Sequence, residues 1–67
     1  MEDFKITLEA ARVNKGLSQK RVAELLGISP QTVCAWEKEP FKITIKDAYR
    51  LADLYCVPLG NLIFVLE

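Results

Sequence analysis

The chain has 67 residues and a mass of 7.6 kDa, a length at which a chain builds one small core and no second module. Apolar residues make up 51% of the sequence and charged residues 27%, which is typical of a globular protein and not of a disordered one. There is no histidine, and the two cysteines, Cys34 and Cys56, form no Cys-x-x-Cys pair. The usual ligand sets for zinc and haem are therefore missing, and we expect no metal, no cofactor and no small-molecule ligand.

The sequence lacks the features of a membrane or secreted protein. Its apolar runs are far shorter than a membrane span, and its first residues lack the basic-then-apolar order of a signal peptide. We therefore expect a cytoplasmic protein with no membrane partner. The formal net charge is zero, which taken alone argues against a nucleic-acid binder. Residues 12–50, however, hold eight basic residues against four acidic ones, so one side of a neutral protein can still attract a polyanion.

The first two predicted helices are short and have recognisable ends. Residues 7–15 form the first, with Thr7 able to cap its N-terminus and Gly16 ending it. Ser18 caps the second helix, and Gly27 can take the left-handed conformation that stops it. The second helix has an expected apolar stripe made of Val22, Ala23, Leu25 and Leu26.

A third helix is predicted directly after a three-residue turn. Ser29 supplies its capping hydroxyl and Pro30 its first helical position, and the helix runs to about Lys38. A loop over residues 39–43 follows, and we expect Phe41 to fill its interior.

The second half of the chain predicts one longer helix and one short one. Thr44 and Asp47 resemble a capping box that opens the longer helix. Val57 and Pro58 close it and start a short fifth helix. The apolar positions are Ile45, Ala48, Leu51, Ala52 and Tyr55 in the longer helix, and Leu59, Leu62 and Ile63 in the fifth.

Residues 18–38 meet the requirements of a helix-turn-helix. Two short helices joined by a tight turn must pack closely, which requires a small residue at their contact and a residue tolerant of positive φ in the turn. Ala23 and Gly27 satisfy these requirements. The apolar residues that would hold the two helices together and against the rest are Val22, Leu26, Ile28, Val33 and Trp36.

The predicted fold class is therefore all-α, a compact five-helix bundle with short β-strands at the chain ends. Residues 4–6 alternate in polarity, and residues 64–66 include β-branched and aromatic side chains. We assign residues 1–67 to one domain, with an apolar C-terminal tail over residues 62–67.

The chain resembles the phage Cro and repressor family of helix-turn-helix domains. The residues that carry this resemblance are Gly16-Leu17-Ser18-Gln19, Ala23, Gly27-Ile28-Ser29, Val33, Trp36-Glu37, Leu51-Ala52, Val57-Pro58-Leu59 and Leu62-Ile63. They span nearly the whole chain and leave out only its two ends. The resemblance implies the bundle of the phage-repressor DNA-binding domain and the function of a small transcriptional regulator.

The outer face of the third helix is the candidate base-reading surface. With Val33 and Trp36 toward the core, Gln31, Ala35 and Lys38 point outward. In the major groove a glutamine can pair with adenine, and an alanine methyl can touch the methyl group of thymine. The alternative is that Gln31 is an ordinary solvated residue and Ala35 only a small helix former. The resemblance places base contacts at these outward positions, flanked by Pro30, Thr32 and Cys34.

Candidate phosphate contacts lie on both sides of this helix. Gln19 is near the start of the second helix, beside its free N–H groups, and the resemblance gives the matching residue this role. The resemblance also pairs Arg12 with Glu37 in a half-buried ion pair that orients the recognition helix, the alternative being two independent surface charges. The cationic candidates for phosphate contacts are Lys38, Lys42 and Lys46. The alternative is that these lysines belong to an ordinary solvated loop and bind no phosphate.

These observations predict a sequence-specific binder of double-stranded DNA that regulates transcription, as a repressor of phage or mobile-element origin. Specificity requires two half-sites about 34–36 Å apart, so we expect a homodimer on an inverted-repeat operator. We expect the C-terminal tail to supply the dimer contact through Leu62, Ile63, Phe64, Val65 and Leu66. The alternative is that the tail pairs within the chain, with residues 4–6.

Other classes of function are less well supported. A protein-interaction module could use the same fold to bind a regulatory partner protein, and zero net charge favours it. Gln31 and Lys38, however, make the outer face of the third helix polar. An enzyme is not expected, because the chain has no histidine, no glycine-rich phosphate loop and no clustered carboxylates. Single-strand binding is not expected either, because Trp36 and Tyr55 fall on apolar helix faces.

Overall fold

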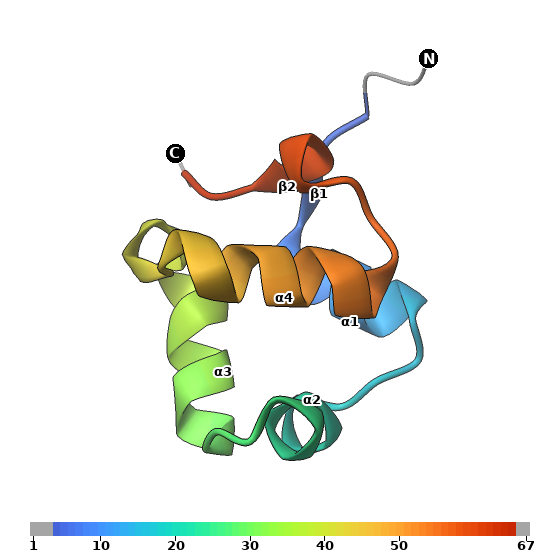
Figure 1. The fold of residues 1–67 in the computed structure, drawn as a ribbon. Coiled ribbons are helices and arrows are strands. Elements are labelled where there is room, and N and C mark those ends of the chain that lie inside the picture. The colour runs from blue at the N-terminus through green and yellow to red at the C-terminus, as the bar shows by residue number, and fades with distance from the viewer. Residues whose placement is uncertain (1–3, 66–67) are drawn as a thin grey trace.

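The computed structural model describes residues 4–65 (Figure 1). Its elements in chain order are β1 (Ile6–Thr7), α1 (Leu8–Asn14), α2 (Gln19–Leu26), α3 (Pro30–Lys38), the single-turn 3₁₀ helix η1 (Pro40–Lys42), α4 (Ile45–Tyr55), a second 3₁₀ turn η2 (Leu59–Asn61) and β2 (Leu62–Ile63). In Figure 1, α4 crosses the front of the molecule with α1 behind it, α3 stands at one end, and α2 lies below. The predicted all-α helix-turn-helix fold is confirmed. None of the helices within residues 4–65 has the length and apolar character needed to cross a membrane.

Each α-helix begins next to the hydroxyl-bearing residue predicted to cap it. In every case the side-chain oxygen accepts a hydrogen bond from the backbone N–H three residues further on. Such bonds satisfy N–H groups that the first turn of a helix leaves without a partner. The four caps, with bonds of 3.0–3.2 Å, are Thr7, Ser18, Ser29 and Thr44.

All four α-helices and β2 contribute to one apolar core. Trp36 packs against its edge, as predicted, and Tyr55 is 4% exposed. The fully enclosed positions include Val22 and Val33, which lie on the two helices of the helix-turn-helix. The buried cluster consists of Leu8, Ala11, Val22, Ala23, Val33, Leu51, Ala52, Tyr55 and Leu62.

Three apolar residues predicted to face inward are exposed instead. Leu25 is 46% exposed, because it lies one position, or about 100° of rotation, away from the inward-facing Leu26 on α2. Ile45 is 70% exposed, because it is the first residue of α4 and lies at the edge of the core. Phe41 is 62% exposed, and the neighbouring Pro40 is buried in its place.

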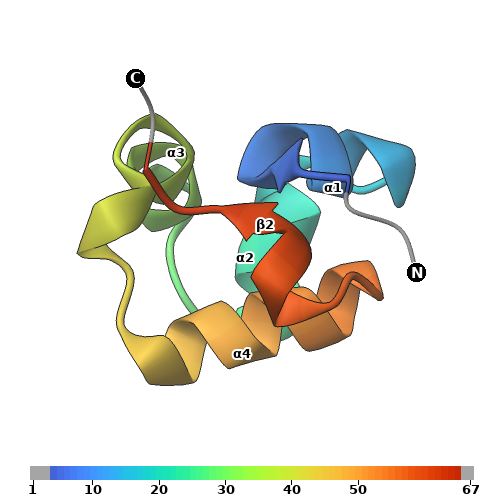
Figure 2. The same cartoon turned by 90° about the horizontal axis from the view of Figure 1, so that it is seen from above.

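The two ends of the described chain meet in a small parallel sheet. The two strands lie side by side (Figure 2), and Ile6 pairs with Leu62 and Thr7 with Ile63. β1 begins two residues after the start of the strand predicted over residues 4–6, and β2 begins two residues before the strand predicted over residues 64–66. The predicted fifth helix is therefore wrong. η2 completes one turn, and the chain then extends because its next residues bond to β1.

Side chains next to this sheet tie the ends together further. The amide nitrogen of Asn61, a residue only 8% exposed, donates to the carbonyl oxygen of Phe4 at 2.6 Å. The Lys5 ammonium donates to the carbonyl oxygen of Gly60 at 3.0 Å. We call these two bonds and the β1–β2 pairing the terminal clasp.

Candidate nucleic-acid interface

α2 and α3 meet across a tight turn that fixes their relative position. Gly27 ends α2 with φ of 72°, and a Cβ built there would meet open space, so the backbone conformation alone requires the glycine. The N–H of Ile28 donates to the Ala23 carbonyl at 3.0 Å, which closes the turn. Val22, Ala23 and Val33, each at most 1% exposed, hold the two helices in one core.

The side of α3 away from the core is open to solvent. Of the six predicted base-contacting residues, Thr32 and Cys34 are half-buried. The Thr32 hydroxyl lies 2.9 Å from the Ser29 hydroxyl, so it is already engaged at the start of the helix. The other four are exposed and available to a partner: Pro30, Gln31, Ala35 and Lys38.

The carboxylate of Glu37 joins three helices. Its Oε2 accepts from Arg12 Nε of α1 at 2.7 Å, and its Oε1 accepts from Gln19 Nε2 of α2 at 2.8 Å. Arg12 also donates to the carbonyl oxygen of Leu17 at 2.9 Å. The charged side chains are 12% and 7% exposed, so this is a largely desolvated pair and not a surface one. We call Arg12, Gln19 and Glu37 the α3 anchor.

The surroundings of the α3 anchor shift two pKa values. The hydrogen bond that Arg12 donates to the Glu37 carboxylate raises the pKa of the Arg12 guanidinium above its usual value, although burial acts in the opposite direction. Burial raises the pKa of the Tyr55 phenol to about 12, and the negative charge of Glu37 adds to the rise. At neutral pH Arg12 is therefore charged and Tyr55 neutral, which suits a structural role and not proton transfer.

A second arginine, which the sequence analysis did not single out, supports the turn from the other side. Arg50 of α4 donates through Nη2 to the carbonyl oxygen of Leu26 at 2.6 Å. Leu26 is the last residue of α2, where helical carbonyls have no partner within the helix. Nη1 of Arg50 also binds Asp47 at 3.2 Å. An arginine three residues after an acidic residue was visible in the sequence, but its link to α2 depends on the tertiary fold.

The cationic residues near α3 differ in how they are paired. Lys42 lies 2.9 Å from Glu39, and Arg21 lies 3.2 Å from Glu24, in exposed pairs three residues apart. Lys38 and Lys46 are exposed and form no ion pair with the acidic residues that the structure describes. Lys38 is in the last turn of α3 and Lys46 in the first turn of α4, on either side of η1.

The C-terminal tail is used partly by the chain itself. Leu62 is 5% exposed and belongs to the core, while Ile63 pairs with β1. Phe64 is half-buried, and Val65 is 67% exposed. Leu66 lies outside the described residues. Any contact between chains through this segment would thus use the side chains beyond Leu62.

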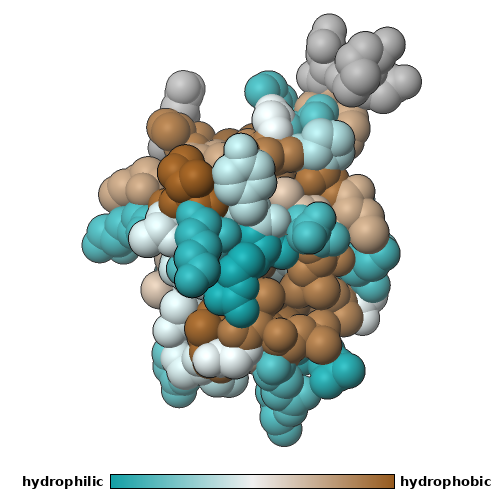
Figure 3. Space-filling model, viewed as in Figure 1, coloured by the Kyte–Doolittle hydropathy of each residue, from teal (hydrophilic) through white to brown (hydrophobic). Residues whose placement is uncertain are grey.

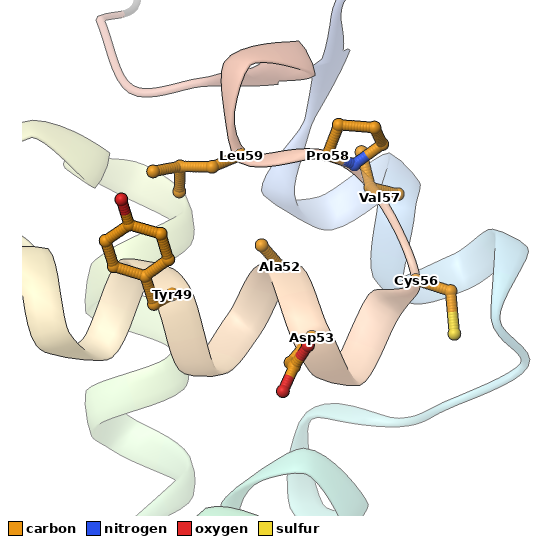
Figure 4. Close-up of a pocket in the computed structure, with 7 residues that line it drawn as sticks. All are labelled: Tyr49, Ala52, Asp53, Cys56, Val57, Pro58 and Leu59. Carbon is orange, nitrogen blue, oxygen red and sulfur yellow. The ribbon is translucent and has the colours of Figure 1, made fainter.

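One shallow groove lies on α4, outside the α2–α3 pair. Tyr49 and Leu59 lie at one end with their side chains pointing toward each other, and Cys56 lies at the other (Figure 4). No cluster of three or more histidine, cysteine or acidic side chains suited to a metal ion occurs in the described part of the chain. The groove is lined by Tyr49, Ala52, Asp53, Cys56, Val57, Pro58 and Leu59.

Two short helices crossing at a glycine turn, with the outer face of the second one open, define a helix-turn-helix domain. The helix-turn-helix family model matches residues 8–62, which is more than half of the chain. The protein therefore belongs to the helix-turn-helix family of the Cro and repressor type, a family of DNA-binding regulatory domains. No curated protein and no solved structure gives a significant match to the chain.

Proposed function

We propose that this protein is a sequence-specific binder of double-stranded DNA that represses transcription, and that it originates from a phage or mobile element. The observation that carries the proposal is the state of α3. Its outer face is exposed, while its inner face is fixed by Val33 and by Glu37 of the α3 anchor. A helix held in this way can enter the major groove as a rigid body.

Base recognition is assigned to the outer face of α3. Gln31 offers an amide that can pair with both adenine N6 and N7, and the short Ala35 lets the helix backbone approach a thymine methyl. Pro30 and Lys38 extend this surface toward the two ends of the helix, and Thr32 and Cys34 lie at its flanks. Sequence preference then arises at Gln31, which can make a bidentate contact with adenine, and at Lys38, which can contact guanine O6 and N7.

Phosphate contacts would position α3 in the groove without reading sequence. The Gln19 amide group carries two protons, and one of them is donated to Glu37. The second remains for a phosphate oxygen beside the start of α2, so that one side chain would link the DNA backbone to the α3 anchor. Lys42 and Lys46 would bind phosphates on the other side of α3.

Specificity on a genome requires more contacts than one small module makes, so we propose a homodimer on an inverted repeat. Occupying an operator of this kind blocks access of other proteins to the same DNA, which is the simplest route to repression for a chain of this size.

Selection of bound fragments from random duplex DNA tests this function. We expect enrichment of an inverted repeat with half-sites about one helical turn apart. The Asn14→Ala chain, changed at an exposed residue of α1, should enrich the same site and serves as the control. Recovery of no sequence above the input would contradict DNA binding, and recovery of lone half-sites would contradict the two-fold arrangement.

A protein-interaction module is the second candidate, and zero net charge favours it. In that case the selection returns no site at any salt concentration. A regulatory partner protein bound to the same face would then lose affinity when Gln31 or Lys38 is replaced by alanine.

A further inference from the structure

Three large side chains beside α3 remain exposed although they are apolar or aromatic. Phe41 is 62% exposed, Ile45 70% and Tyr49 60%. Ile45 and Tyr49 are four residues apart on α4 and so share one face of that helix. Figure 3 shows apolar surface at the end of the molecule where α4 begins. We call these three residues the α4 patch.

The α4 patch continues into the free part of the C-terminal tail. Figures 1 and 2 both show the segment after β2 passing above the C-terminal end of α3. Val65 in this segment is 67% exposed. On the other side, the Leu59 side chain extends toward Tyr49 (Figure 4). The exposed apolar surface is therefore larger than its three central residues.

We propose that the α4 patch is the surface on which a second copy of this chain docks, with Val65 at its edge. At these exposures the three central side chains present roughly 350–400 Å², within the range of a functional patch on a monomer. A stable interface needs about 800 Å² on each partner, so the patch would form the apolar centre and its surroundings the rim. Lys42 at the rim is paired with Glu39, which reduces repulsion between two identical surfaces.

The distance expected between the α3 helices of two docked copies favours a second copy over another partner. α3 has nine residues, so its midpoint lies about 7 Å from its C-terminal end. η1 and the start of α4 add the width of one helical segment, about 10–12 Å. Two copies joined across the α4 patch, with the C-terminal ends of both α3 helices toward the two-fold axis, would therefore hold the α3 midpoints roughly 34–38 Å apart. Successive major grooves on one side of DNA are separated by about 34–36 Å.

Sedimentation velocity over a concentration series, without DNA, tests the surface directly. Ile45→Glu and Tyr49→Glu should each weaken self-association by at least about 30-fold. Val13→Glu is the matched control, because Val13 is an apolar residue of α1 that is 58% exposed, and it should leave self-association unchanged. Circular dichroism should show every variant folded, because all three positions are solvent-exposed.

The comparison with the spacing of the major grooves rests on the proposed function. DNA-binding measurements therefore test the docking surface and the proposed function separately. Tyr49→Ala, which removes apolar area without adding a charge beside Lys46, should keep the affinity of the wild-type chain for a single half-site within about threefold and lose the gain in affinity that the full inverted repeat provides. A wild-type chain that dimerises but binds no duplex sequence would refute the function and leave the docking surface intact.

Two outcomes would overturn the docking surface itself. The first is a wild-type chain that stays monomeric both free and on DNA, because the patch would then serve a different partner. The second is a dimer that survives Ile45→Glu and Tyr49→Glu unchanged. If Phe64→Asp dissociates that dimer, the interface is the tail alone.

Discussion

The residue that most constrains α3 is Glu37. Its two oxygens accept hydrogen bonds from Arg12 and Gln19, which belong to two other helices, so α3 cannot rotate without breaking both bonds. Removing one member of a desolvated pair leaves the other charge buried without compensation. Deletion of one partner therefore measures the cost of an uncompensated buried charge and not the net contribution of the pair.

Arg12→Ala should lower the free energy of unfolding by about 3 kcal/mol, because the Glu37 carboxylate then loses its charged partner. Urea denaturation followed by circular dichroism measures this. Arg21→Ala is the control, because the Arg21–Glu24 pair is 57% and 53% exposed and should contribute less than about 0.5 kcal/mol. Equal effects of the two substitutions would argue against a desolvated pair.

Tyr55 gives the protein a specific weakness at alkaline pH. The pKa of its phenol is raised from 10.0 to about 12 in the folded chain. The folded state thus binds this proton more tightly than the unfolded state, and the resulting stability is complete below about pH 10 and lost as the pH rises through about 12. The loss should be about 2–3 kcal/mol.

Thermal melts between about pH 10 and 12 should show this loss of stability in the wild-type chain and in the control variant Tyr49→Phe. Tyr55→Phe, which has no phenolic proton to lose, should show a smaller decline over the same range. A decline as steep as that of the wild-type chain would mean that Tyr55 does not carry the effect.

Gln31 and Lys42 should separate base reading from backbone binding. Gln31→Ala should cost about 1–3 kcal/mol at the selected operator and relax the preference at one base pair in each half-site. Lys42→Ala should weaken binding to all duplexes alike and reduce the slope of log affinity against log salt by about one. Titrations at several salt concentrations measure both, and identical behaviour of the two variants would contradict the assigned roles.

At the scale of the elements, two helix ends use the same backbone conformation with different residues. α2 ends at Gly27 with φ of 72°, and α4 ends at Cys56 with φ of 57°. The left-handed conformation is unfavourable for a residue with a Cβ and costs glycine nothing. The second end is therefore the more strained of the two.

Gly27→Ala should destabilise the fold by about 1 kcal/mol, because the added Cβ meets no neighbour and the cost is that of the backbone alone. Cys56→Gly should stabilise it by about 0.5 kcal/mol, since the strain relieved slightly exceeds the added freedom of the unfolded chain. Denaturant titrations measure both. Cys56→Ala keeps the Cβ and should lie close to the wild-type chain, so a gain in Cys56→Ala as large as in Cys56→Gly would contradict this explanation.

The elements also differ in how well the sequence predicts them. The helix starts were predictable because a hydroxyl and the N–H three residues on lie close in sequence, as at Ser18. The exposure of Ile45 was not, because helical spacing identifies a face but not whether another element covers it. The fifth helix failed for a similar reason, since the pairing of Leu62 with Ile6 is a contact between distant parts of the chain.

In the candidate interface, too, the sequence predicted the local features and not the contacts between distant parts of the chain. The outward face of α3 could be derived from the positions of Val33 and Trp36 on the helix. The Arg12–Glu37 pair was reached through family resemblance, because residues 25 positions apart give no local signal. The bond from Arg50 to Leu26 required the tertiary structure.

At the scale of the whole molecule, the terminal clasp closes the chain. Asn61→Ala removes the bond to the Phe4 carbonyl and should lower the free energy of unfolding by about 1 kcal/mol. It should also speed hydrogen exchange at the β1–β2 amides more than elsewhere. Asn14→Ala, at an exposed asparagine on α1, should change neither, and uniform acceleration over the whole chain would show that the clasp is not a separate unit.

The ion pairs between residues three apart have a consequence for how the proposed regulator would find its site. Arg21, Lys42 and Arg50 each hold a carboxylate already, so a phosphate must compete with that carboxylate for the cation. Random DNA offers phosphates and no base contact to offset this competition, and a chain of zero net charge would stay on it only briefly. Such a regulator would depend on base contacts more than on phosphate contacts to remain at its site.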